Sequence, residues 1–273
     1  MSDINVINGC MAQEDKAKAL SGVKHKIVVM SGKGGVGKST VAVNLAAGLV
    51  KRGYSVGLLD ADIHGPSVPK LLGSPDEQLT VMDGHIRPAQ ILPQLRVISI
   101  AYIVEEKDAP VIWRGPVKMG AIRQFIEDVE WGELDYLIVD LPPGTGDEPL
   151  SVAQLIPNVD GAVIVTTPQE VALISVRKSI RFAHLVGLKV LGLVDNMNGF
   201  VCPHCGEAAK GLESSLAIQA AMEYGIPYLG KIPLDPQVAQ SGEKGEPFVL
   251  SGDSRAEAFD SIIDKIVSTV NGE

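Results

Sequence analysis

The chain has 273 residues, of which 45% are apolar, and its 24 basic and 33 acidic side chains give a net charge of −9. This acidic balance argues against a nucleic-acid backbone as the main partner. The sequence has no apolar run long enough to span a membrane, and residues 1–15 lack the basic and apolar regions of a signal peptide. Because only three cysteines occur, a disulfide framework is not expected, and the expected location is the cytoplasm.

We expect a single α/β domain at residues 25–273, because no linker or charge block divides that part of the chain. Residues 1–24 are polar and are predicted to form a flexible N-terminal segment. Cys10 lies in that segment, and we interpret it as a thiol with no special role.

Residues 26–40 read KIVVMSGKGGVGKST. The pattern predicts a buried strand at Lys26–Ser31, a glycine-rich loop, and then a helix. The loop fits the P-loop motif G-x-x-x-x-G-K-[ST], in which backbone amides and a helix N-terminus bind phosphates. Lys38 is expected to reach the β- and γ-phosphates of ATP, and the Ser39 hydroxyl to hold Mg²⁺. The expected nucleotide-binding residues are Gly32, Lys33, Gly34, Gly35, Val36, Gly37, Lys38, Ser39 and Thr40.

A second lysine, Lys33, directly follows the first glycine of the loop. The spelling GKGGVGKST resembles the deviant P-loop ATPases, which include partitioning ATPases, Min-type ATPases, the nitrogenase iron protein and iron–sulfur cluster carriers. In that group the extra lysine reaches across a dimer to the partner's nucleotide. The resemblance therefore implies a homodimer and a catalytic role for Lys33, and the alternative is a solvated loop lysine.

The run from Tyr54 to Leu59 predicts a second strand, which ends in Asp60-Ala61-Asp62. Acidic residues at the carboxyl end of a parallel strand lie at the ligand edge of the sheet. We expect Asp62 to position the attacking water and Asp60 to support it, although aspartates that cap a turn would give the same pattern.

Residues 76–100 predict a small hairpin and another strand. Residues 111–125 predict a turn that leads into a helix. Arg114, at this turn, is expected to contact the nucleotide or a partner, or else to form a surface salt bridge.

The apolar strand Tyr136–Val139 ends in Asp140 and is followed by Leu141-Pro142-Pro143-Gly144. An aspartate in this place holds Mg²⁺, usually through water, so Asp140 is a candidate catalytic and metal-binding residue. The Gly144 N–H can approach a γ-phosphate, which would make this segment a nucleotide-dependent switch.

Further along, the pattern predicts a strand at 162–166, a helix at 171–186 and a strand at 189–195. Asn196 follows this last strand and is expected to hydrogen-bond the adenine edge, unless it lies in an ordinary turn. A helix at 213–224 and a strand at 227–232 come next. The amphipathic pattern of residues 255–270 predicts a helix that packs on the core.

Residues 199–206 contain a C-x-x-C pair, Cys202 and Cys205. Its surroundings do not fit a thioredoxin-like dithiol. A zinc or iron–sulfur site needs about four ligands. One chain offers Cys202 and Cys205, with His204 or the distant Cys10 as further candidates, whereas two chains related by a two-fold axis would supply four thiolates. Both metals accept thiolates, so iron–sulfur and zinc remain open at this point.

Taken together, the motifs resemble those of the Mrp/ApbC iron–sulfur cluster carrier ATPases over residues 22–270. The matching segments are GKGGVGKST (32–40), DADIHGPS (60–67), WRGP (113–116), DLPPGTGD (140–147), DNM (195–197) and CPHC (202–205). The resemblance implies a homodimer that binds and slowly hydrolyses ATP. It also implies a labile [4Fe–4S] cluster held between subunits by Cys202 and Cys205 and passed to apo-proteins.

The expected fold is a doubly wound, mostly parallel α/β sheet of the deviant Walker A (SIMIBI) P-loop class, with ATP at the carboxyl edge of the strands. Three rival functions are considered: a positioning ATPase that binds DNA or membrane, an ATP-gated electron donor, and an ATPase dimer stapled by structural zinc. We favour the cluster carrier, with neither nucleic acid nor membrane as a partner.

Overall fold

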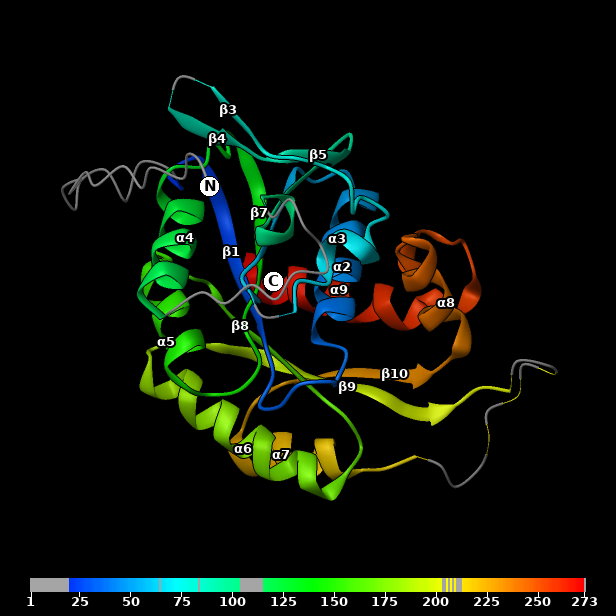
Figure 1. Ribbon diagram of the computed structural model, residues 1–273. Helices are drawn as coiled ribbons and strands as arrows, with labels where there is room; N and C mark the ends of the chain where they lie inside the picture. Colours follow the sequence, from blue (N-terminus) through cyan, green and yellow to red (C-terminus); the bar gives the residue numbers. More distant parts are fainter. Residues whose placement is uncertain are drawn as a thin grey trace.

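The computed structural model describes residues 20–63, 65–82, 84–103, 115–202, 205, 207, 209 and 213–272. Its centre is an eight-stranded sheet with the order β10-β9-β8-β1-β7-β2-β6-β5 (Figure 1). Neighbouring strands in this sheet run parallel except for β5 and β6, which are antiparallel. A separate antiparallel hairpin joins β3 and β4.

The strands are β1 (Val23–Met30), β2 (Val56–Asp60), β3 (Thr80–Met82), β4 (His85–Arg87), β5 (Ala89–Leu92), β6 (Leu95–Ser99), β7 (Leu134–Asp140), β8 (Gly161–Thr166), β9 (Val190–Phe200) and β10 (Tyr228–Leu234). The α-helices are α2 (Lys38–Lys51), α3 (Val68–Leu71), α4 (Gly115–Glu127), α5 (Asp147–Leu155), α6 (Glu170–Leu185), α7 (Leu216–Tyr224), α8 (Pro236–Lys244) and α9 (Glu257–Asn271). Short 3₁₀ turns occur at Ile100–Tyr102, Phe248–Leu250 and Ser254–Ala256.

The central strands are buried on both sides, because helices cover both faces of the sheet (Figure 1). In β1, Val28 and Met30 belong to the core under α4, α5, α6 and α7, whereas Ile27 and Val29 belong to the core under α2 and α9. This arrangement explains the continuous apolar runs in the sequence and confirms the predicted doubly wound fold.

The C-terminal helix α9 packs on the core, as its amphipathic pattern predicted. Its buried side chains are Phe259, Ile262, Ile263 and Ile266. None of the helices in the described part of the chain is both long and apolar enough to cross a membrane.

The register of the sheet brings the predicted site segments to one edge. Asp60, the last residue of β2, lies opposite Asp140, the last residue of β7. Asp140 also pairs with Val29 of β1, the strand that leads into the P-loop. The carboxyl ends of three neighbouring strands therefore carry the P-loop and both acidic segments, at the edge where such sheets bind ligands.

Some element boundaries differ from the predictions. β1 begins at Val23, because the Val23 and Leu134 backbones already pair with each other. Within the segment predicted as a hairpin, residues 85–92 form two strands, β4 and β5, which are separated at Pro88, a residue with no N–H for a strand ladder. β9 continues past Asp195 to Phe200, because β10 pairs with it over that length. Cys10, Arg114 and His204 lie outside the described residues, as does most of the segment expected to be flexible.

Candidate functional site

The P-loop lines a cavity of about 300 Å³ at the carboxyl edge of the sheet. Its lining residues are Ser31, Gly34, Gly35, Gly37, Lys38, Ser39, Thr40, Asp62, Gly65, Ser67, Leu71 and Pro143. Gly37, just before α2, has φ 79°, and a Cβ there would lie 2.2 Å from Asn196 Nδ2. Only glycine fits this position, which turns the chain so that the N-terminus of α2 faces the cavity.

Lys38 and Ser39 both contact Asp140 below the loop. Lys38 Nζ lies 2.6 Å from Asp140 Oδ1, and the Ser39 hydroxyl donates to Asp140 Oδ2 at 2.5 Å. The Lys38 side chain is 6% exposed and that of Asp140 is 0% exposed. Burial raises the pKa of Asp140, against the opposing positive charge of Lys38. The structure thus joins a hydroxyl and a carboxylate, oxygen donors of the kind that Mg²⁺ prefers.

The two aspartates after β2 occupy different environments. Asp60 is buried and accepts hydrogen bonds from Ser99 Oγ at 3.0 Å and from the Asp62 N–H at 3.2 Å. Burial and the neighbouring charge of Asp140 raise the pKa of Asp60 to about 8. Asp62 is half-buried and lines the P-loop cavity, where its Oδ1 accepts a bond from the Gly65 N–H at 3.3 Å. Asp62 therefore faces the cavity, and Asp60 supports it from behind.

The segment after β7 is held against the P-loop by its backbone. The Gly144 N–H donates to the Ser31 carbonyl at 2.8 Å, and Gly144 has φ 98°, which favours glycine. To reach a phosphate, this N–H would have to break its bond to the Ser31 carbonyl. A segment that alternates between two such hydrogen bonds can act as a switch.

Lys33 contacts the segment just before α6. Its Nζ donates to Gln169 Oε1 at 3.0 Å, next to the start of α6. The lining of the P-loop cavity, as far as the chain is described, does not include Lys33.

A second cavity of about 350 Å³ continues from the first and shares Thr40, Ser67 and Leu71 with it. Asn196, Met197 and the segment 233–235 line its far side. The Asn196 Nδ2 donates to the Val36 carbonyl at 2.8 Å, which leaves its Oδ1 as an acceptor at this cavity. Together, the two cavities form a trough with phosphate donors at one end and Asn196 at the other.

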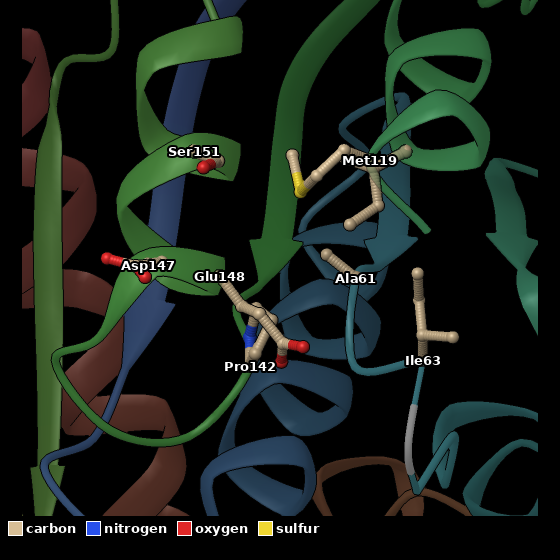
Figure 2. Close-up of a pocket in the computed structure, with 8 residues that line it drawn as sticks. Ala61, Ile63, Met119, Pro142, Asp147, Glu148 and Ser151 are labelled. Atoms are coloured by element: carbon tan, nitrogen blue, oxygen red, sulfur yellow. The ribbon is translucent and has the colours of Figure 1, made fainter. Parts of the chain in front are cut away.

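A third, smaller cavity of about 130 Å³ lies between the segments that follow β2 and β7 (Figure 2). Ala61, Ile63, Met119, Ile122 and Pro142 give it an apolar lining, with the acidic side chains of α5 at its rim. Ligand pockets usually measure about 300 Å³ or more, so this space is too small for a nucleotide.

Cys202 and Cys205 lie on a loop that extends directly from β9. Cys202 is half-buried and Cys205 is exposed. The Cys202 N–H donates to the Glu207 carbonyl at 3.0 Å, which closes the loop around the pair. Within the described residues, no group of three or more His, Cys, Asp and Glu side chains comes together as a metal site.

Several residues of the site were not identified from the sequence. Ser67, Leu71 and Pro143 line the P-loop cavity, and Gln169 binds Lys33. Ser67 and Pro143 belong to the matched motifs and could have been found there. Gln169 could not, because its contact with Lys33 depends on how α6 packs beside the loop.

Comparisons with known proteins agree with this geometry. The family model described as ParA, NUBPL iron-transfer P-loop NTPase, matches residues 22–268. The iron–sulfur cluster carrier protein of Methanocaldococcus jannaschii is 48% identical over 96% of this chain and 91% of its own length. The protein of the same name from Saccharolobus solfataricus is 47% identical over 92% of this chain and 86% of its own length.

Solved structures give the same picture. A nucleotide-binding protein of Archaeoglobus fulgidus, in complex with ADP, is 39% identical and has a TM-score of 0.78 over 91% of this chain and 97% of its own. The septum site-determining protein MinD of Pyrococcus horikoshii, with Mg-ADP, has a TM-score of 0.67 at 22% identity over 91% of this chain and 98% of its own. At that identity the likeness concerns the fold alone.

Proposed function

We propose, from the premise that this chain belongs to the family of NUBPL iron-transfer P-loop NTPases, that it is an ATP-hydrolysing carrier of iron–sulfur clusters. The observation that carries the proposal is the position of Cys202 and Cys205 on a loop that extends from β9, the strand that also lines the nucleotide trough. The relatives named iron–sulfur cluster carrier proteins, which align with nearly the whole chain, support it.

In this proposal the trough binds ATP in the cytoplasm. The amides from Gly34 to Thr40 and Lys38 hold the phosphates, and the adenine lies beside Asn196, whose Oδ1 can accept from its amino group. Ser39 would hold Mg²⁺ directly and Asp140 would hold it through water, as is usual in such sites. The ion would neutralise charge on the phosphates.

Hydrolysis is assigned to this chain's own side chains. Asp62 faces the P-loop cavity and orients the attacking water, while Lys38 offsets the charge of the phosphates. Gly144 exchanges its bond with the Ser31 carbonyl for one with the γ-phosphate. When the γ-phosphate is lost, the Gly144 N–H bonds to the Ser31 carbonyl again, and the conformation of the segment after β7 changes.

The proposed carrier is a homodimer. Lys33 leaves Gln169 and reaches the nucleotide of the partner, since it does not line the cavity of its own chain. One chain offers two thiols at the loop, and a [4Fe–4S] cluster is commonly held by about four. The twin chain completes the set, and the cluster is the cargo that is passed to apo-proteins.

The test is anaerobic reconstitution with iron and sulfide, followed by metal analysis, visible absorption and transfer to an acidic apo-ferredoxin. We expect bound iron and sulfide, a charge-transfer band and transfer to the ferredoxin, all lost in a Cys202→Ser, Cys205→Ser double variant. Bound zinc without iron, and no charge-transfer band, would instead favour a dimer held together by structural zinc.

A further inference from the structure

The strand that lines the nucleotide trough becomes irregular just before the cysteine loop. Asn196 of β9 faces Ile232 of β10, and the next pair is Phe200 with Leu234. Since β9 advances from 196 to 200 while β10 advances only from 232 to 234, residues 197–199 form a bulge. Met197 has φ 59° there, a left-handed conformation that is uncommon for a residue with a side chain.

One asparagine just before this bulge and one within it bond to different parts of the molecule. Just before the bulge, Asn196 Nδ2 donates to the Val36 carbonyl of the P-loop at 2.8 Å. Within the bulge, Asn198 is 2% exposed and bonds twice with the Ser214 backbone. Its Nδ2 donates to the Ser214 carbonyl at 2.7 Å, and its Oδ1 accepts from the Ser214 N–H at 2.9 Å.

A buried carboxylate holds the Asn198 amide in place. Asp195 is 0% exposed, and its Oδ2 accepts from Asn198 Nδ2 at 2.5 Å. Its Oδ1 has no hydrogen-bond partner in the part of the chain that the structure describes. Burying a carboxylate with only one of its two oxygens hydrogen-bonded lowers the stability of the folded state.

The contacts of Asn198 form the base of the cysteine loop. Above the Asn198–Ser214 contact, the Ala209 N–H donates to the Phe200 carbonyl at 2.8 Å. Above that, the Cys202 N–H donates to the Glu207 carbonyl at 3.0 Å. Three successive contacts, of which the first is that of Asn198 with Ser214, therefore set the position of the Cys202 backbone.

We propose that Asn198 is a positioning residue for the cluster thiolates, and that the bulge at 197–199 links the P-loop to them through Asn196. The inference rests on the proposed function, because it takes Cys202 and Cys205 as the cluster ligands. Groups that orient metal ligands without touching the metal commonly change metal affinity 10- to 100-fold. The loop cannot shift at its base without breaking the bonds that Asn198 makes.

The test measures how fast a ferrous chelator removes iron from the anaerobically reconstituted protein, with and without Mg-ATP. In Asn198→Ala we expect release about 10-fold faster than in the wild type. In the wild type, the rate of iron release should differ with and without Mg-ATP. In Asn198→Ala this difference should vanish, while the rate of ATP hydrolysis by the variant stays unchanged. The matched control is Gln219→Ala, which removes an exposed amide bond to Ser215 in the neighbouring helix and should behave like the wild type.

A charge swap separates positioning from damage to the fold. Asn198→Asp sets a second carboxylate against Asp195 and should speed release further. Adding Asp195→Asn restores the amide–carboxylate contact between 195 and 198, but not the bond to the Ser214 carbonyl, and should therefore slow release part of the way. Absence of that rescue contradicts a positioning role.

Three other outcomes decide the matter. Equal release from Asn198→Ala and the wild type overturns the proposal. A wild-type rate that is the same with and without Mg-ATP overturns the link through the bulge. A wild type that binds no iron and sulfide overturns the proposed function, and the positioning role with it.

Discussion

At the scale of single residues, Lys38 pairs with a buried carboxylate and, in the proposed function, also offsets the charge of the phosphates. Its ammonium group lies 2.6 Å from a carboxylate that is 0% exposed, and it also lines the phosphate end of the trough. A buried carboxylate without a cation is strongly unfavourable. Lys38 therefore offsets the free-energy cost of burying the Asp140 carboxylate and keeps that carboxylate beside the Ser39 hydroxyl.

Replacing Lys38 should lower both stability and the rate of ATP hydrolysis. For Lys38→Ala we expect an unfolding free energy lower by about 3 kcal/mol, because one partner of a buried pair is lost. We expect ATP hydrolysis to fall about 100-fold or more, because a charge that stabilises the transition state is gone. Urea unfolding and phosphate release measure the two effects. Lys178→Ala, at an exposed position on α6, is the control, and a Lys38→Ala variant that hydrolyses ATP normally would contradict the assignment.

Asn196 offers a test of base recognition. If its Oδ1 accepts from the adenine amino group, Asn196→Ala should weaken ATP binding about 10-fold while weakening GTP binding less. Titration calorimetry with both nucleotides measures this. An equal loss for ATP and GTP would mean that Asn196 only holds the Val36 carbonyl and does not read the base.

Asp195 should make stability depend on pH. Burial raises its pKa from 3.8 to about 6, against the opposing effects of Asn198 and Lys231. Between these values the folded state binds the proton more tightly than the unfolded state does, so acid favours folding. The unfolding free energy of the wild type, relative to Asp195→Asn, should therefore fall as the pH rises from 4 to 7. Denaturant unfolding at several pH values measures the two unfolding free energies. If their curves against pH ran parallel for the wild type and the variant, the raised pKa of Asp195 would be refuted.

At the scale of elements, the sequence pattern predicts the buried strands and the C-terminal helix well, because their apolar spacing reflects burial directly. β1, β7 and β8 carry continuous apolar runs that only a doubly covered sheet accommodates. β9 was predicted to end at Asp195, because Asn196 and Asn198 resemble a polar turn. Both are buried in the structure, where Asn196 bonds to Val36 and Asn198 bonds to Ser214, and a local pattern does not reveal these contacts.

The packing of α9 gives a prediction at this scale. Ile263 is 1% exposed and its Cδ1 lies 2.2 Å from the position that a Cβ on Gly48 of α2 would take. Ile263→Ala should lower the unfolding free energy by about 2–5 kcal/mol through the cavity it leaves. Leu185→Ala, at a side chain 86% exposed, should change it little. Equal effects in thermal or urea unfolding would show that α9 does not pack as described.

The candidate site was predictable to the extent that it follows motifs. The P-loop, Asp62, Asp140 and the cysteine pair are predicted from local patterns. The structure places the P-loop and Asp62 around one cavity, with Asp140 buried against Lys38 beneath it. The contacts of Lys33 with Gln169 and of Asn198 with Ser214 were not predicted. Both depend on segments that meet only through the packing of helices around the sheet.

At the scale of the whole molecule, the proposed carrier consists of two copies of the chain. Each chain has a nucleotide trough, a lysine that bonds to Gln169 and does not line that trough, and two thiols on one loop. In the proposal, a second copy receives Lys33 and supplies the remaining ligands of the cluster.

The most direct test is native mass spectrometry of the anaerobically reconstituted protein with Mg-ATP, read together with iron and sulfide analysis. We expect a dimer that carries about four iron and four sulfide ions per two chains, as four thiolates would hold. Cys202→Ser should give protein without the cluster. A single chain that keeps its iron and sulfide in the presence of Mg-ATP would contradict the shared site.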